Sequence, residues 1–262
     1  MPIARYLLLL YGRTAVRPYD LLEIIDLIYL IKTAVIMLCI GHRGAMGHEP
    51  ENTLLSIKKA LSLGVDAIEI DVYNVEDNLV VIHDRSLDRT TNGTGYLEER
   101  TFSYLRSLDA GKGEQIPTLE EVFETVNRKA IINIELKGSN TAPLVASLIQ
   151  KYVNQGWFYP DFVVSSFNHY ELHQLKTICP KIIIGMLIYG LPWEYLTAAR
   201  KLQADIVIAN LDVVTSELVA RVHQKELLAW VYTVNEPEDI DRLRALEVDA
   251  IFTNYPERVL SS

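Results

Sequence analysis

From residue 35 to its end, the chain alternates short runs of β-branched and other apolar residues with longer amphipathic segments. This alternation is typical of strand–helix units, in which the helices cover a sheet of parallel strands. The eight predicted strands are Val35–Ile40, Ala67–Val72, Ala130–Leu136, Phe162–Ser165, Ile182–Leu187, Ile206–Ala209, Leu228–Val234 and Ala250–Thr253. The predicted helices lie near Thr53–Leu63, Leu119–Asn127, Pro143–Val153, His169–Ile178, Trp193–Leu202, Ser216–Gln224 and Pro237–Leu246. Eight such units in 262 residues predict an α/β fold, a (β/α)8 TIM barrel, rather than an open sheet.

One connection is much longer than the others. About 35 residues separate Asp84 from the helix near Leu119, and they include the turn-forming sequence RTTNGTG. A long connection after the second strand belongs at the mouth of a barrel, where it acts as a lid or a specificity element. We therefore predict a single barrel domain over residues 37–262, with an insertion after strand two at about 85–115.

Residues 1–36 form an N-terminal extension that is rich in Leu, Ile and Tyr. Asp20 can cap a helix over Leu21–Thr33, so we expect an extra apolar helix packed on the barrel. Two alternatives remain: contact with a membrane surface through this extension, or a true start of synthesis at Met37.

The net charge of -9 and the pI near 5.2 argue against a nucleic-acid partner, because binding the phosphate backbone requires a basic surface. An acidic protein that binds a phosphate must do so with a few cations inside a pocket. Cys39 and Cys179 have no metal-binding spacing, and two cysteines in a chain of this length indicate a reducing compartment. The predicted localisation is therefore cytoplasmic, and both cysteines are expected to be small buried hydrophobic residues.

Acidic residues lie on two neighbouring predicted strands. Glu69 and Asp71 are two residues apart, so both side chains face the barrel axis, and Glu135 on the next barrel strand offers a third carboxylate. Neighbouring carboxylates raise each other's pKa unless a cation lies between them. Three carboxylates with open positions for water and substrate oxygens favour one hard divalent cation, Mg²⁺ or Ca²⁺, over Zn²⁺, which prefers nitrogen and sulfur.

Two histidines and two cations are expected beside these carboxylates. His42 follows the first predicted strand, and His83 ends a run that returns from the turn at 77–78 toward the second strand. Two imidazoles near a metal-bound phosphate can act as general base and general acid. Arg43 and Lys137 are the expected donors to the phosphate oxygens.

Several motifs support a family assignment because they occur together and in one order. HRG…PENT, EIDV, VVIHD followed by LDRTTNGTG, LDAG, IPTLEE and INIELK resemble the glycerophosphodiester phosphodiesterase family from Ile40 to about Pro256. No known part of that family matches residues 1–36.

The resemblance implies a divalent cation held by Glu69, Asp71 and Glu135, acid/base roles for His42 and His83, and phosphate contacts for Arg43 and Lys137. It also implies that Glu51 and Asn52 line the site, with Asn52 orienting the groups that hold the cation. The insertion matches the family's small subdomain beside the substrate cleft. Members cleave a diester to sn-glycerol 3-phosphate and an alcohol, and the glycerol's own neighbouring hydroxyl can attack first.

The chain departs from the family pattern at two positions of interest. Tyr232 replaces the tryptophan of the family's WTVN motif, which keeps an aromatic wall but adds a hydroxyl. Asn254 stands where the family has an aspartate before the last Tyr-Pro. Neither change removes an expected metal ligand, so we expect activity.

Three functions compete at this point. The favoured one is hydrolysis of small glycerophosphodiesters such as glycerophosphocholine, because the two histidines and three carboxylates are intact. A phospholipase D-like or lysophospholipase D-like activity on membrane surfaces is motivated by the apolar residues 1–36. Non-catalytic metabolite binding on a retained fold is the third. The headgroup, the physiological cation, the base among the two histidines and the oligomeric state are not assigned by the sequence.

Overall fold

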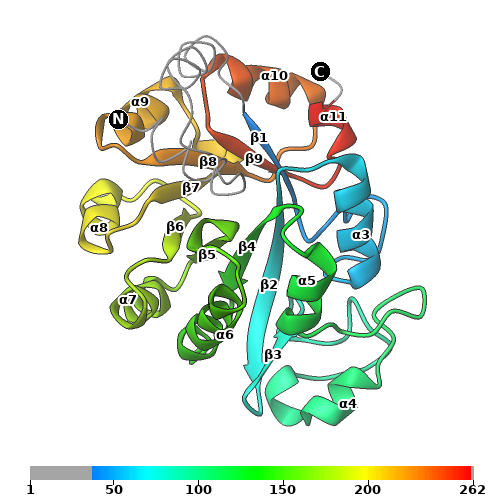
Figure 1. Ribbon diagram of the computed structural model, residues 1–262. Coiled ribbons are helices and arrows are strands. Elements are labelled where there is room, and N and C mark those ends of the chain that lie inside the picture. The colour runs from blue at the N-terminus through cyan, green and yellow to red at the C-terminus, as the bar shows by residue number, and fades with distance from the viewer. Residues whose placement is uncertain (1–36, 261–262) are drawn as a thin grey trace, which may run out of the picture.

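The computed structural model describes residues 37–260, and Figure 1 shows a barrel of strands surrounded by helices. The barrel strands are β1 (Leu38–Gly41), β2 (Ala67–Val75), β4 (Ile131–Leu136), β5 (Phe162–Ser166), β6 (Ile183–Ile188), β7 (Ile206–Asn210), β8 (Leu228–Tyr232) and β9 (Ala250–Thr253). Each pairs in parallel with its neighbours, and β1 closes the barrel by pairing with both β2 and β9. The predicted TIM-like barrel is therefore confirmed.

The helices outside the barrel are α3 (Leu54–Leu63), α5 (Leu119–Val126), α6 (Ala142–Asn154), α7 (His169–Ile178), α8 (Tyr195–Lys201), α9 (Ser216–Gln224), α10 (Pro237–Ala245) and α11 (Glu257–Leu260). Local sequence sets several of their starts. Thr118 and Glu121 form a reciprocal capping box at α5, and Pro237 occupies the first turn of α10. The predicted helix near Trp193 begins two residues later, at Tyr195, and this displacement leaves Trp193 in an exposed loop.

Two apolar cores follow from the alternation of side chains along each strand. On β2, Ile68 and Ile70 belong to the large core between strands and helices, whereas Ala67 belongs to the smaller core inside the barrel. Trp230 and Phe252 fill that interior, with ring centroids 5.9 Å apart. The same alternation turns the acidic residues of β2 toward the barrel axis.

The connection after β2 forms an excursion from the barrel. Strand β2 continues past the barrel and pairs antiparallel with β3 (Asn78–Val81), after which come the 3-10 turn η1 (Leu97–Glu99) and α4 (Phe102–Arg106) (Figure 1). A small apolar core that includes Leu87, Leu97 and Leu105 holds this segment together.

Two further predictions concern the ends and the cysteines. The expected helix in residues 1–36 lies outside the described residues. Cys39 and Cys179 are free and buried, as predicted. None of the helices between residues 37 and 260 is both long and apolar enough to cross a membrane.

Candidate active site

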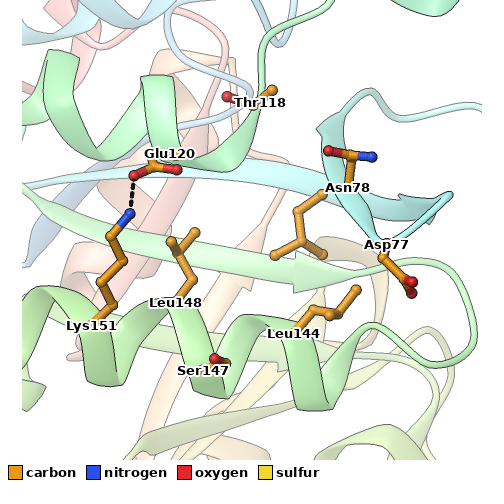
Figure 2. Close-up of a pocket in the computed structure, with 9 residues that line it drawn as sticks. Asp77, Asn78, Thr118, Glu120, Leu144, Ser147, Leu148 and Lys151 are labelled. Atoms are coloured by element: carbon orange, nitrogen blue, oxygen red, sulfur yellow. Dashed lines mark hydrogen bonds and ion pairs between the residues drawn. The ribbon is translucent and has the colours of Figure 1, made fainter. Parts of the chain in front are cut away.

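A cavity of about 170 Å³ opens at the carboxyl ends of the barrel strands. Its lining comprises His42, Arg43, Glu69, His83, Asn133, Glu135, Lys137, Ser165, Phe167, Leu187, Tyr232, Thr233 and Phe252. In TIM barrels this end of the strands carries the active site. A larger groove of about 280 Å³ lies outside the barrel between the β2–β3 turn and α6 (Figure 2). That groove contains one ion pair, between Glu120 and Lys151, and none of the predicted site residues.

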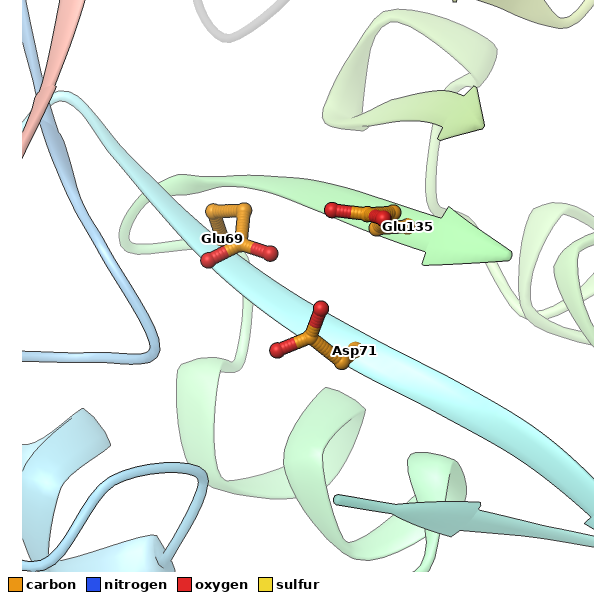
Figure 3. A group of neighbouring side chains, drawn as sticks. All are labelled: Glu69, Asp71 and Glu135. Atoms are coloured by element: carbon orange, nitrogen blue, oxygen red, sulfur yellow. The ribbon is translucent and has the colours of Figure 1, made fainter. Parts of the chain in front are cut away.

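The carboxylate cluster lies within the barrel mouth (Figure 3). Asp71 on β2 is directly opposite Glu135 on β4, and Glu69 points to the same face as Asp71. One oxygen atom of each of the three lies within 4.8 Å of the others. Glu69 and Asp71 are buried and Glu135 is nearly so.

The electrostatics of this cluster favour a bound cation. Burial, followed by the charge of Asp71, raises the pKa of Glu69 well above its ordinary value. The same two causes raise the pKa of Glu135 to about 7. Asp71 Oδ1 is buried and accepts no hydrogen bond from the described part of the chain. An all-oxygen donor set with a buried oxygen that accepts no hydrogen bond from the described residues fits a hard divalent cation.

Arg43 is positioned by a tight turn after β1. Its backbone has a positive φ of 51°, and the next residue, Gly44, has a φ of 84°. A Cβ on Gly44 would lie 2.6 Å from the backbone carbon of Ser56 on α3, so only glycine allows this approach. The turn lets the Arg43 amide donate to Glu69 Oε2 at 2.9 Å, while the Arg43 guanidinium lies 3.4 Å from Asp71 Oδ2.

Lys137 directly follows the last residue of β4, and its positive charge offsets the negative charge of the cluster. Its Nζ lies 3.0 Å from Glu135 Oε1, 3.7 Å from Asp71 Oδ1 and 3.2 Å from His83 Nε2. Asn52 supports the cluster on the other side, because its Nδ2 donates to Asp71 Oδ2 at 2.9 Å. A metal-ligating carboxylate commonly needs such a partner to hold its orientation.

His42 is held by a neutral amide. Its Nδ1 lies 2.7 Å from Asn254 Oδ1. Because an amide oxygen only accepts, Nδ1 carries the proton and Nε2 is the unprotonated nitrogen. Burial, then the charge of Arg43, lower the pKa of His42 to about 4. His42 is therefore a neutral imidazole at pH 7.

His83 is held by a carboxylate instead. Its Nδ1 lies 2.6 Å from Asp84 Oδ1, and Asp84 in turn accepts from Arg89 Nε at 2.6 Å. The hydrogen bond from Arg89, followed by that from His83, holds the pKa of Asp84 well below its usual range. Arg89 also donates to both oxygens of Glu51, at 2.7 and 2.8 Å, and Glu51 accepts from Arg43 at 2.7 Å. This network ties the excursion after β3 to the site.

Tyr232 forms one wall of the cavity. Its ring packs edge-on against Phe167 with centroids 5.8 Å apart, and its hydroxyl donates to the carbonyl of Ile188 at 2.9 Å. The structure thus brings all ten residues named from the sequence to one end of the barrel. Sequence reasoning did not assign Asp84, Arg89, Asn133, Ser165 or Phe167 to the site. Asp84 could have been found, because it directly follows His83 in the VVIHD motif.

Comparisons with known proteins agree on one kind of enzyme. A glycerophosphodiester phosphodiesterase of Caldanaerobacter subterraneus is 37% identical over 237 residues, which is 86% of this chain and 96% of that protein. A glycerophosphodiester phosphodiesterase of Bacillus subtilis is 32% identical over 251 residues, or 84% of each chain. The solved structure of an Oleispira antarctica phosphodiesterase, in complex with the product sn-glycerol-3-phosphate, has a TM-score of 0.79 at 28% identity and covers 86% of this chain and 95% of its own.

The fold, the acidic cluster and these relatives together define a phosphoric diester hydrolase built on a TIM-like barrel. The model of the glycerophosphoryl diester phosphodiesterase family matches residues 42–258, which is most of the chain. The chain belongs to this family.

Proposed function

We propose that this protein hydrolyses glycerophosphodiesters to sn-glycerol 3-phosphate and an alcohol. The observation that carries the proposal is the convergence, in one cavity of about 170 Å³, of two imidazoles, two cationic side chains and an acidic cluster. The product bound to the Oleispira antarctica enzyme supports the same substrate class. In this proposal residues 37–262 are the catalytic domain and residues 1–36 are an extension to it.

Glu69, Asp71 and Glu135 hold one divalent cation, Mg²⁺ or Ca²⁺, in the proposed mechanism. When bound, the cation neutralises charge on the phosphate and polarises its oxygens. Arg43 and Lys137 bind the remaining phosphate oxygens, since each already lies beside the acidic cluster and carries donors directed to it. Their charge stabilises the negative charge that develops on the phosphoryl group.

The surroundings of the two histidines support different roles. His42 is neutral and its Nε2 is unprotonated, so we assign it as the base that removes the proton from the attacking hydroxyl. The carboxylate of Asp84 lies 2.6 Å from His83 Nδ1 and orients the ring so that Nε2 faces the cluster, so we assign His83 as the acid that protonates the leaving alcohol oxygen. Lys137 Nζ donates to His83 Nε2 in the present arrangement. When a phosphate draws Lys137 away, Nε2 can bind a proton from solvent, and this is the proton that His83 donates to the leaving alcohol oxygen.

The test is turnover of purified protein on a panel of glycerophosphodiesters, with glycerophosphocholine and glycerophosphoethanolamine first, in Mg²⁺ or Ca²⁺ and in chelator. We expect release of sn-glycerol 3-phosphate that chelator abolishes. His42→Ala and His83→Ala should each lower kcat by at least about 100-fold while the circular dichroism spectrum is retained. Absence of turnover on every headgroup would refute the substrate class, and chelator-resistant turnover would refute the metal site.

A further inference from the structure

An apolar patch lies at the amino end of the barrel, opposite the candidate active site. Phe158 shortly precedes β5, and Ile178 is the last residue of α7, which leads into β6. Each of these two side chains is 51% exposed. Because β5 and β6 are parallel neighbours, the residues before them lie at the same end of the sheet. We call Phe158, the half-buried Tyr159 and Ile178 the amino-end patch, and a group of exposed apolar residues of this kind marks an interaction surface.

The amino-end patch is firmly held by the elements beneath it. The Tyr159 hydroxyl donates to Gln150 Oε1 on α6 at 2.6 Å. The buried carboxylate of Asp161 accepts from the backbone amide of Phe158 at 2.9 Å and fixes the path of this segment. Ile178 also borders a groove of about 490 Å³ between α6 and the end of α7. The patch is therefore a preformed surface with an adjoining hollow.

Cationic side chains surround the amino-end patch. Arg128 and Lys129 precede β4, the neighbour of β5, and Lys181 precedes β6; all three are exposed. Arg128 Nη1 donates to the carbonyl of Gly156 at 2.9 Å, and Lys181 Nζ lies 5.7 Å from the ring centroid of Tyr159. In a protein of net charge -9, this local positive charge favours an acidic partner.

One segment of this chain has the matching pattern. Residues 21–33 read LLEIIDLIYLIKT, and a helical register places Ile24 and Ile28 on one face and Glu23 and Asp26 on the other. Helices that lie on a membrane surface carry Lys and Arg on their polar face. Because the polar face is acidic here, an apolar surface surrounded by cations suits this segment better than an anionic membrane does.

The segment is long enough to reach the patch. Met37 directly precedes β1, at the amino end of the barrel. Strand β5 is three strand spacings from β1, through β2 and β4, so the starts of β1 and β5 lie about 14 Å apart. The 13 residues of 21–33 span about 20 Å as a helix, and residues 34–36 add about 10 Å. The segment can therefore cross the amino end of the barrel from β1 to the patch.

We propose that residues 21–33 bind the amino-end patch of the same chain as an amphipathic helix. The face that carries Ile24 and Ile28 packs on the patch and removes its exposed side chains from water. The surrounding cations attract the acidic side chains of the segment. The catalytic cavity lies at the other end of the barrel, so binding leaves it open, and the proposal does not depend on the function proposed above.

Hydrogen exchange in the full-length protein, followed by mass spectrometry, tests the proposal. We expect the backbone amides of residues 21–33 to exchange at least about tenfold more slowly than those of an unstructured chain. Phe158→Ser/Ile178→Ser should abolish this protection, because the apolar contact is lost. Both side chains are half exposed, so the barrel should be retained. The matched control is Tyr170→Ser, an exposed aromatic residue in the first turn of α7, at the opposite end of the barrel, which should keep the protection.

A reciprocal pair of variants tests the segment itself. Ile24→Ser/Ile28→Ser should speed the exchange of residues 155–161 and 174–181, because the patch loses its cover. The matched control is Leu30→Ser, which lies on the acidic side of the same helical register and should leave that exchange unchanged. Turnover of glycerophosphocholine should be unchanged in all four variants. Exchange is informative even if the wild type shows no turnover, so the two proposals can fail separately.

Three results would overturn the proposal. The first is exchange of residues 21–33 at the unstructured rate, or protection that Phe158→Ser/Ile178→Ser does not reduce. The second is protection that appears only with phosphatidylglycerol vesicles, because the partner of the segment would then be a membrane surface. The third is protection that disappears when a dimer dissociates on dilution, because the partner would then be a second copy of the chain.

Discussion

Replacement of Glu135 by glutamine should stabilise the metal-free protein above neutral pH. Burial, then the charge of Asp71, raises the pKa of Glu135 from 4.5 to about 7, and this net shift already includes the opposing ion pair with Lys137. A raised pKa means that the folded state prefers the protonated acid. The stabilisation that protonated Glu135 gives the folded state is complete below pH 4.5 and is lost as the pH rises through 7. The difference between a pKa of 4.5 and one of about 7, at 1.36 kcal/mol for each pH unit, gives an upper limit of about 3 kcal/mol at pH 8.

Urea unfolding in chelator measures this difference. We expect Glu135→Gln to exceed wild type by up to about 3 kcal/mol at pH 8, and by only about 0.5 kcal/mol at pH 4.5, where most of the penalty has disappeared. Glutamine retains the shape and can still accept a hydrogen bond from Lys137. The matched control is Glu217→Gln on α9, whose side chain is 79% exposed and which should show no such dependence on pH.

Saturating Mg²⁺ or Ca²⁺ should reverse the order of stability. A ligand that binds only the folded state stabilises it by mass action, and the variant has lost one of three carboxylates. If Glu135→Gln is instead destabilised in chelator by the same amount at both pH values, Glu135 is an ordinary partner of Lys137. The reasoning that derives a cation site from repulsion within the cluster would then be wrong.

Three further predictions test the surroundings of the site. Asn254→Asp places a carboxylate beside His42 Nδ1 and raises the pKa of this histidine, so the acidic limb of the kcat/KM profile should move up by about 1 pH unit or more; an unmoved limb would exclude His42 as the base. Arg89→Ala removes the donor that fixes Asp84, and kcat/KM for glycerophosphocholine should fall roughly tenfold to 100-fold; wild-type kinetics would show that the network does not orient the site. Thr118→Ala removes the capping box of α5 and should cost about 1 kcal/mol in urea unfolding, without a change in kcat.

Much of the fold was predictable because side-chain pattern reports burial. The eight apolar runs, separated by amphipathic helices, are enough to predict a barrel of parallel strands. Such strands are covered on both faces and are therefore continuously apolar. Helix caps such as Thr118 were predictable for the same local reason. Where prediction erred by a few residues, as at Trp193, the error fell on a loop whose side chains have no core to pack against.

The catalytic partners were less predictable because they come from distant parts of the chain. His42 and Asn254 are 212 residues apart and meet only because β1 pairs with β9. Arg89 reaches Glu51 across 38 residues, from an excursion whose path no periodicity describes. The hydroxyl of Tyr232 was visible as a departure from the family motif, but its acceptor on β6 was not.

The sequence by itself determined the barrel, the family and the residues that carry chemistry, because strand period, helix period and motif order are local properties of the chain. Apart from the contact between His83 and the adjacent Asp84, the tertiary structure decided what those residues touch. Closure of the barrel gave His42 a neutral amide and left His83 with a carboxylate, and this difference in partner separates the two histidines chemically. It also joined the residues before β5 and β6 into one apolar patch at the amino end of the barrel, because parallel neighbours begin at the same end of the sheet.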